Sequence, residues 1–151
     1  MRLFNLLNEL TLSVGIGGVT PDETESVTLL FDDEHEVTFL PDKNSDAVYF
    51  QCEVGDASQL RHDGCRVLLE ASFSRANGAA FSIHTALQKI VLWKRFGEFA
   101  SRAELEMAIN DFLSQVVTWK QRLTMDDFHA EEAEDLLPPY MPGLTSNIIQ
   151  V

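Results

Sequence analysis

The sequence predicts an α+β fold, a small antiparallel sheet of about five strands with three helices, in the order α-β-β-β-α-β-β-α. Two patterns support this prediction. Apolar residues recur at helical spacing in three segments, and in the segments between them they alternate with polar residues. The chain has 151 residues, 45% of them hydrophobic, which suits one domain with a single core. We expect this domain to span residues 1–123 and an acidic, proline-containing tail, dispensable for folding, to span residues 124–151.

Residues 2–14 form the first predicted helix, because aliphatic residues recur every three or four positions. The stripe comprises Leu3, Leu6, Leu7, Leu10 and Val14. The glycine-rich residues 15–18 indicate the end of this helix, since glycine is the usual residue of a left-handed C-terminal cap. They do not match a phosphate-binding loop, because they follow a helix and lack its glycine spacing.

Residues 26–54 show the period of two that is typical of β-strands. Three alternating runs, at residues 27–31, 36–39 and 48–54, are separated by polar turns at residues 32–34 and 41–46. We therefore predict a three-stranded antiparallel meander with one almost wholly apolar face.

The predicted helix over residues 60–76 is apolar around most of its circumference. Val67 and Leu68 occupy one side, and Leu69 and Phe73 occupy the adjoining side. A helix of this kind must be buried on two sides. Because a small domain offers one sheet to pack on, we expect the second side to contact another copy of the chain; a helix sandwiched within its own domain is the alternative. The residues predicted for this dimer interface are Val67, Leu69, Phe73, Phe81 and Ile83.

The last part of the predicted domain contains two strands and a long helix. The strand-like runs cover residues 79–84 and 87–96 and are joined by a short turn at Thr85 and Ala86. Ser101 and Glu104 then form a capping box that opens a helix ending near Leu123. The apolar stripe of this helix comprises Leu105, Ile109, Phe112, Val116, Trp119 and Leu123.

The charge of the chain argues against nucleic acid and anionic membranes as partners. The sequence has 24 acidic and 11 basic residues, a net charge of −13, and residues 1–56 carry 12 of the acids and 2 of the bases. No apolar run reaches the roughly 18 residues that a membrane span needs. Cys52 and Cys65 fit two reduced thiols better than a disulfide framework. We expect a cytoplasmic protein.

The residues that support catalysis or metal binding in other proteins do not form a recognisable set here. His35, His62, His84 and His129 are scattered without metal-ligand spacing, and no nucleophile motif is present. We interpret His35 as part of a solvated turn, and Cys65 as a small core residue. We therefore expect a protein that is not an enzyme and that uses no cofactor or metal.

The order of elements resembles the class I type III secretion chaperones, also called the CesT-like or Tir chaperone family. The resemblance covers residues 2–123 and is carried by five segments. These are the leucine-rich first helix at residues 3–10, its glycine exit at 15–17, the strand and turn at 29–33, the helix at 68–71 with its end at 75–78, and the strand at 87–93. The tail after residue 123 is long for that family.

The resemblance implies a homodimer that binds the N-terminal region of a secreted effector in the bacterial cytosol and keeps it soluble and competent for secretion. The apolar surface of the first helix and the meander exceeds what one small core needs, and this surplus predicts the binding site. The predicted effector-binding residues are Leu3, Leu6, Leu7, Leu10, Leu30, Phe39, Val48 and Phe50.

Two alternatives belong to other functional classes. The first is an acidic inhibitor or immunity protein that covers a basic site on a toxin or nuclease, with the acids of residues 1–56 steering association. The second is a small hydrolase or ligand-binding domain. Salt distinguishes the first from a chaperone, because charge-steered inhibition weakens at high salt and binding through apolar grooves persists.

Overall fold

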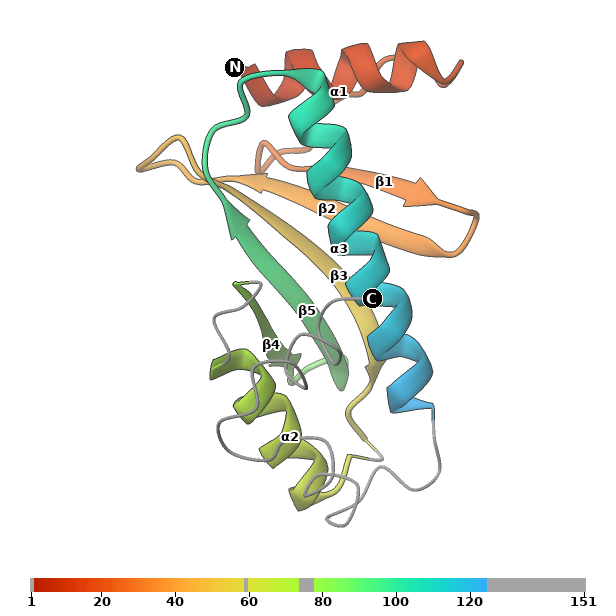
Figure 1. The fold of residues 1–151 in the computed structure, drawn as a ribbon, viewed down its shortest axis with the longest axis vertical. Coiled ribbons are helices and arrows are strands. Elements are labelled where there is room, and N and C mark those ends of the chain that lie inside the picture. The colour runs from red at the N-terminus through yellow and green to blue at the C-terminus, as the bar shows by residue number, and fades with distance from the viewer. Residues whose placement is uncertain (1, 59, 74–77, 125–151) are drawn as a thin grey trace.

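The computed structural model describes residues 2–58, 60–73 and 78–124, and these contain three helices and one five-stranded sheet (Figure 1). The elements are α1 (Arg2–Ser13), β1 (Val27–Phe31), β2 (His35–Pro41), β3 (Val48–Asp56), α2 (His62–Phe73), β4 (Ala79–His84), β5 (Lys89–Phe96) and α3 (Arg102–Leu123). The predicted fold class and element order are confirmed. The predicted tail lies outside the described residues, apart from Thr124.

The sheet is antiparallel throughout, with the strand order β1-β2-β3-β5-β4. The first three strands form the predicted meander. Strand β5 then inserts between β3 and β4, and its pairing with β3 runs from Val48 opposite Phe96 to Asp56 opposite Lys89, interrupted by a bulge between Glu53 and Gly55. Among the described strands, β1 and β4 are therefore the two edges.

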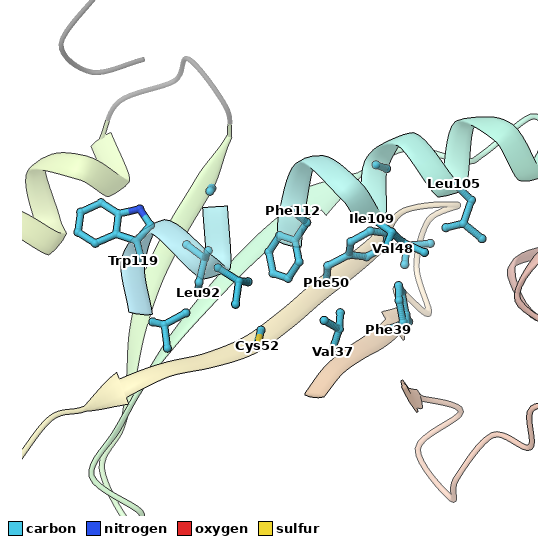
Figure 2. Packing of buried hydrophobic residues seen from close by; sticks show 14 of the residues in the cluster. Val37, Phe39, Val48, Phe50, Cys52, Leu92, Leu105, Ile109, Phe112 and Trp119 are labelled. Carbon is cyan, nitrogen blue, oxygen red and sulfur yellow. The ribbon is translucent and has the colours of Figure 1, made fainter. Parts of the chain in front are cut away.

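The core lies on one face of this sheet, beneath α3, which crosses it obliquely (Figure 1). Alternate residues of β3 are buried, as the period of two predicts, beginning with Val48 and Phe50. The Phe50 ring lies between β3 and α3, with its centroid 4.7 Å from that of Phe39 and 5.7 Å from that of Phe112 (Figure 2). These edge-to-face contacts join the meander to α3 in one core.

The helix ends have the predicted capping chemistry. Gly15 has a φ of +77°, and the Ile16 N–H donates to the Thr11 carbonyl at 2.8 Å, which closes α1 with a left-handed cap. At the start of α3 the Ser101 hydroxyl accepts from the Glu104 N–H at 3.3 Å, and the Glu104 carboxylate accepts from the Ala100 N–H at 2.8 Å. The capping box is confirmed, with the glutamate bonded to the residue before Ser101.

The prediction of a solvated His35 is wrong. The side chain faces the core, as the alternation of β2 requires, and the residue is 5% exposed. Its Nδ1 lies 2.9 Å from the Nζ of Lys120 on α3. Because an ammonium group only donates, Nδ1 accepts this bond and the imidazole connects the β1–β2 turn to α3. The burial of His35 could not be predicted from the residues around it, because α3, which covers this turn, is far away in the sequence.

Candidate interaction surfaces

The N-terminal part of α1 borders a hollow of about 390 Å³, which we call the α1 hollow. Its other walls are the β2–β3 turn and the loop between β5 and α3. Its floor is apolar, and charged residues surround it. The lining residues are Arg2, Leu3, Leu6, Glu25, Pro41, Asp42, Lys43, Ser45, Asp46, Ala47, Val48, Glu98 and Phe99. Such a hollow has the size and composition of a site that takes one or two apolar side chains.

Local hydrogen bonds hold the walls of the α1 hollow in place. The Arg2 guanidinium lies 3.1 Å from a Glu98 carboxylate oxygen and donates to the Ala100 carbonyl at 2.6 Å, which ties α1 to the β5–α3 loop. In the β2–β3 turn, the Asp42 carboxylate accepts from the Asn44 N–H at 2.9 Å and from the Ser45 hydroxyl at 2.8 Å. These two bonds hold the pKa of Asp42 below its usual range. The turn is thus shaped by its own side chains.

The structure places the eight residues predicted for effector binding in three environments. Three of them are buried apolar residues that also line the α1 hollow: Leu3, Leu6 and Val48. Two others differ in exposure, since Leu10 is half-buried against the core and Leu30 is 52% exposed on β1. The remaining three have no exposed surface and belong to the core of the protomer: Leu7, Phe39 and Phe50.

The second side of α2 is open to solvent. Leu69 is 70% exposed and Phe73 is 83% exposed, and Ile83 on the neighbouring strand β4 is 42% exposed. We call these three residues the α2 face. Of the other residues predicted for a dimer interface, Val67 is buried within the protomer, and Phe81 is half-buried with its ring 4.6 Å from that of Trp119. Within the described residues, the protomer leaves this apolar face exposed.

A depression of about 260 Å³ lies between α2 and β4, beside the α2 face. Its lining residues are Cys65, Leu68, Leu69, Ser72, Phe81, Ser82 and Ile83. The Ser72 hydroxyl accepts from the Phe81 N–H at 2.9 Å and donates to the Leu68 carbonyl at 2.8 Å, so α2 satisfies one donor on the edge of β4. Cys65, predicted to be a core residue, is half-buried beside this depression.

The face of the sheet opposite α3 contains apolar and aromatic side chains outside the core. It is defined by Leu40, Tyr49, Gln51 and Trp93, which are all half-buried, together with the exposed Glu36 and Glu53, and we call it the open sheet face. The rings of Tyr49 and Trp93 are 6.1 Å apart. None of these residues is among those predicted to bind an effector, although they occupy the alternate positions of the predicted strands.

At the end of the sheet that contains the β1–β2 turn and the last residues of β3 is a second hollow of about 470 Å³, which we call the acidic hollow. Five carboxylates and one ammonium group line it. Its lining residues are Leu30, Asp33, Glu34, Glu36, Glu53, Val54, Gly55, Asp56 and Lys120. The Lys120 ammonium also contacts the Glu34 carbonyl, at 3.4 Å, and His35. This end of the sheet is therefore strongly negative.

The described residues contain no group of three or more His, Cys, Asp or Glu side chains arranged to hold a metal ion. Burial raises the pKa of the Cys52 thiol to about 11, so this thiol stays protonated near neutral pH. In the same part of the chain no helix has both the length and the apolar content needed to cross a membrane. The surfaces described above are suited to binding other chains.

Comparisons with known proteins agree with this description. The ExsC–ExsE complex has a chain with a TM-score of 0.73 at 22% identity, covering 83% of this chain and 96% of that one. A chain of the HopA1–SchA chaperone–effector complex has a TM-score of 0.65 at 11% identity, and the match covers 78% of this chain and 91% of that one. The structure of the Yersinia pestis type III secretion chaperone SycH with a fragment of YscM2 has a TM-score of 0.58 at 16% identity. The match covers 77% of this chain and 98% of that one.

These structural likenesses establish a shared fold. No curated protein sequence matches this chain. The model of the Tir chaperone protein (CesT) family matches residues 5–120, which include most of α1 and α3 and every element between them. The chain belongs to the Tir chaperone protein (CesT) family.

Proposed function

We propose that this chain is a type III secretion chaperone that binds the N-terminal region of a secreted effector in the bacterial cytosol and keeps it soluble and competent for secretion. The family match over residues 5–120 carries this proposal. Two of the similar structures support it by their descriptions, since one is a chaperone–effector complex and the other is a type III secretion chaperone in complex with a fragment of YscM2.

The α1 hollow is the site that best fits an effector segment. Its apolar floor includes Leu3, Leu6 and Val48, three of the predicted effector-binding residues, and Phe99 adds an aromatic side chain from the β5–α3 loop. A segment without a fold of its own can insert an apolar side chain into such a hollow at little steric cost. Leu7, Phe39 and Phe50 support this site from the core and do not contact the effector in this proposal.

We also propose that the chaperone is a homodimer that pairs through the α2 face. Leu69, Phe73 and Ile83 are exposed on adjoining elements, and removing them from water stabilises the dimer. In a two-fold dimer each apolar residue is buried twice, once on each protomer. This arrangement covers the second side of α2 that the protomer leaves exposed.

A substitution that fills the α1 hollow tests the effector site. Asp46 lines the hollow and is exposed, so Asp46→Trp places an indole there without altering the core. We expect this variant to lose at least about tenfold in affinity for the protein encoded next to this chain's gene, measured by titration calorimetry. Asp46→Asn controls for the charge, and Asn44→Trp controls for a bulky residue in the same turn outside the lining.

The outcomes separate the proposed function from its rivals. Full binding by a folded Asp46→Trp variant contradicts the α1 hollow as the effector site. Binding that disappears at high salt favours the acidic-inhibitor alternative, because apolar contacts persist when charges are screened. A wild-type chain that binds no secreted protein refutes the chaperone function itself.

A further inference from the structure

At the β2–β3 turn, beside the α1 hollow, neighbouring residues of the strands lie on opposite faces of the sheet. Val48 lines the hollow on the core side, and the next residue, Tyr49, lies on the open sheet face. On the other strand Pro41 lines the hollow, and the preceding Leu40 is paired with Tyr49. An extended chain that leaves the hollow over this turn therefore arrives first at Leu40 and Tyr49.

The centre of the open sheet face has the composition of a protein-binding hot spot. Tyr49 is paired with Leu40 on one side and Arg95 on the other, and Trp93 is paired with Gln51 on the adjoining strand. Tyrosine, tryptophan and arginine are the residues most enriched where binding energy concentrates. Tyr49 and Trp93 are half-buried and lie outside the core cluster, so they keep aromatic surface available.

The far end of the open sheet face selects for positive charge. Val37 is paired with Cys52, which places Glu36 and Glu53 opposite each other on neighbouring strands. Like charges in this position destabilise a sheet. The Lys89 ammonium lies 3.0 Å from a Glu53 carboxylate oxygen, and both glutamates line the acidic hollow with three further carboxylates. Lys89 offsets part of the repulsion between Glu36 and Glu53, and a cation from a partner would offset more of it.

The distance between Tyr49 and Glu53 indicates which side chains a bound segment would need, and at what spacing. Tyr49 and Glu53 are four residues apart on one strand, or about 13 Å at roughly 3.3 Å per residue. An extended partner segment covers the same distance in about four residues. The matching segment has a large apolar or aromatic residue followed, about four positions later, by lysine or arginine.

We propose that the bound effector segment continues from the α1 hollow over the β2–β3 turn onto the open sheet face, placing an apolar side chain on Tyr49 and Trp93 and a basic one against Glu36 and Glu53. The inference rests on the proposed function, because it extends the path of the same client. It assigns binding to residues that the α1 hollow does not include.

Tryptophan fluorescence tests the path without any substitution in the chaperone. The chain has two tryptophans, and Trp119 is fully buried, so acrylamide quenching of the free protein reports mainly on the half-buried Trp93. The probe is the N-terminal fragment of the protein encoded next to this chain's gene, with any tryptophan replaced by phenylalanine. We expect the quenchable component to be lost in the complex, and unchanged quenching would overturn the inference.

Two substitutions test the energetics. Trp93→Ala should weaken binding of the same fragment by about tenfold or more. Glu36→Gln should weaken it several-fold at low salt and make its salt dependence shallower. The matched controls are Leu12→Ala at the exposed end of α1 and Glu23→Gln in the loop before β1, which should bind like the wild type. Circular dichroism and sedimentation check the fold and the oligomeric state of each variant.

Each outcome decides between the proposals. A folded Trp93→Ala variant that binds normally while Asp46→Trp does not would overturn this inference and leave the proposed function intact. A Trp93→Ala variant that turns a dimer into a monomer would assign the open sheet face to a second copy, which also overturns it. Failure of the wild type to bind the fragment would refute the proposed function and this inference together.

Discussion

The α2 face allows dimerisation to be tested by single charge substitutions. Leu69→Glu or Phe73→Glu should convert a dimer into a monomer while leaving the protomer folded. The protomer tolerates both changes because Leu69 is 70% exposed and Phe73 is 83% exposed, so neither supports the core. In a dimer the same substitutions would bury a carboxylate without a partner.

The size of the effect follows from the exposed fractions. Burying a whole leucine or phenylalanine side chain stabilises by about 1.5–3 kcal/mol. Leu69 has roughly two thirds of its surface left to bury, which corresponds to about 1–2 kcal/mol in each protomer. Two-fold symmetry doubles this to about 2–4 kcal/mol per substitution, a change in Kd of roughly 30- to 1,000-fold before the desolvation of the charge is added.

Sedimentation velocity across a micromolar concentration series measures this change, and circular dichroism checks the fold. Leu12→Glu is the matched control, because Leu12 is also a leucine near a helix end and is 64% exposed, but it lies on α1. We expect the control to remain dimeric. A wild-type chain that sediments as a monomer at micromolar concentration, or charge variants that both remain dimeric, would refute the reasoning.

Two further predictions concern titratable groups. Cys52 is 3% exposed and its thiol pKa is raised to about 11, mainly by burial, so at pH 8 a maleimide should modify Cys52 much more slowly in the folded protein than in urea; equal rates would contradict the buried position of Cys52. Hydrogen bonds from the Ser26 hydroxyl and from Thr24 hold the pKa of Asp22 well below its usual range. The Asp22 carboxylate therefore stabilises the fold above about pH 4, and this contribution is lost as the pH falls through the pKa that Asp22 has in the folded protein. Urea denaturation should therefore show Asp22→Asn to be less stable than the wild type at pH 6, with the difference shrinking toward pH 2; a constant difference would contradict this assignment.

Local pattern was enough to predict most of the fold. The period of two located the strands of the meander, because alternate side chains of a strand point to opposite faces. The apolar circumference of the second helix predicted an uncovered side, and Leu69 and Phe73 are exposed as that prediction requires. Each of these signals depends on residues close together in the sequence.

The α1 hollow could not be predicted in full, because its walls come from segments far apart in the chain. Arg2 and Glu98 meet across 96 positions, and Phe99 enters the floor from a loop with no regular pattern. An amphipathic stripe shows which side of a helix is apolar, but it does not show whether the rest of the chain covers that side. Leu7 is an example, because it belongs to the predicted binding stripe and the rest of the chain buries it fully.

The same limit explains why the open sheet face was overlooked. Phe39, Val48 and Phe50 were predicted to bind and lie on the more apolar face of the meander, but a strongly apolar face is the one that a small domain covers with its own helix, here α3. A surface that stays exposed in the free protein must remain compatible with water, so it mixes aromatic side chains with charges. Tyr49 and Trp93, set among Gln51, Glu53 and Arg95, have this mixture. In this chain the half-polar positions of the strands therefore form an exposed surface that is separate from the apolar floor of the α1 hollow.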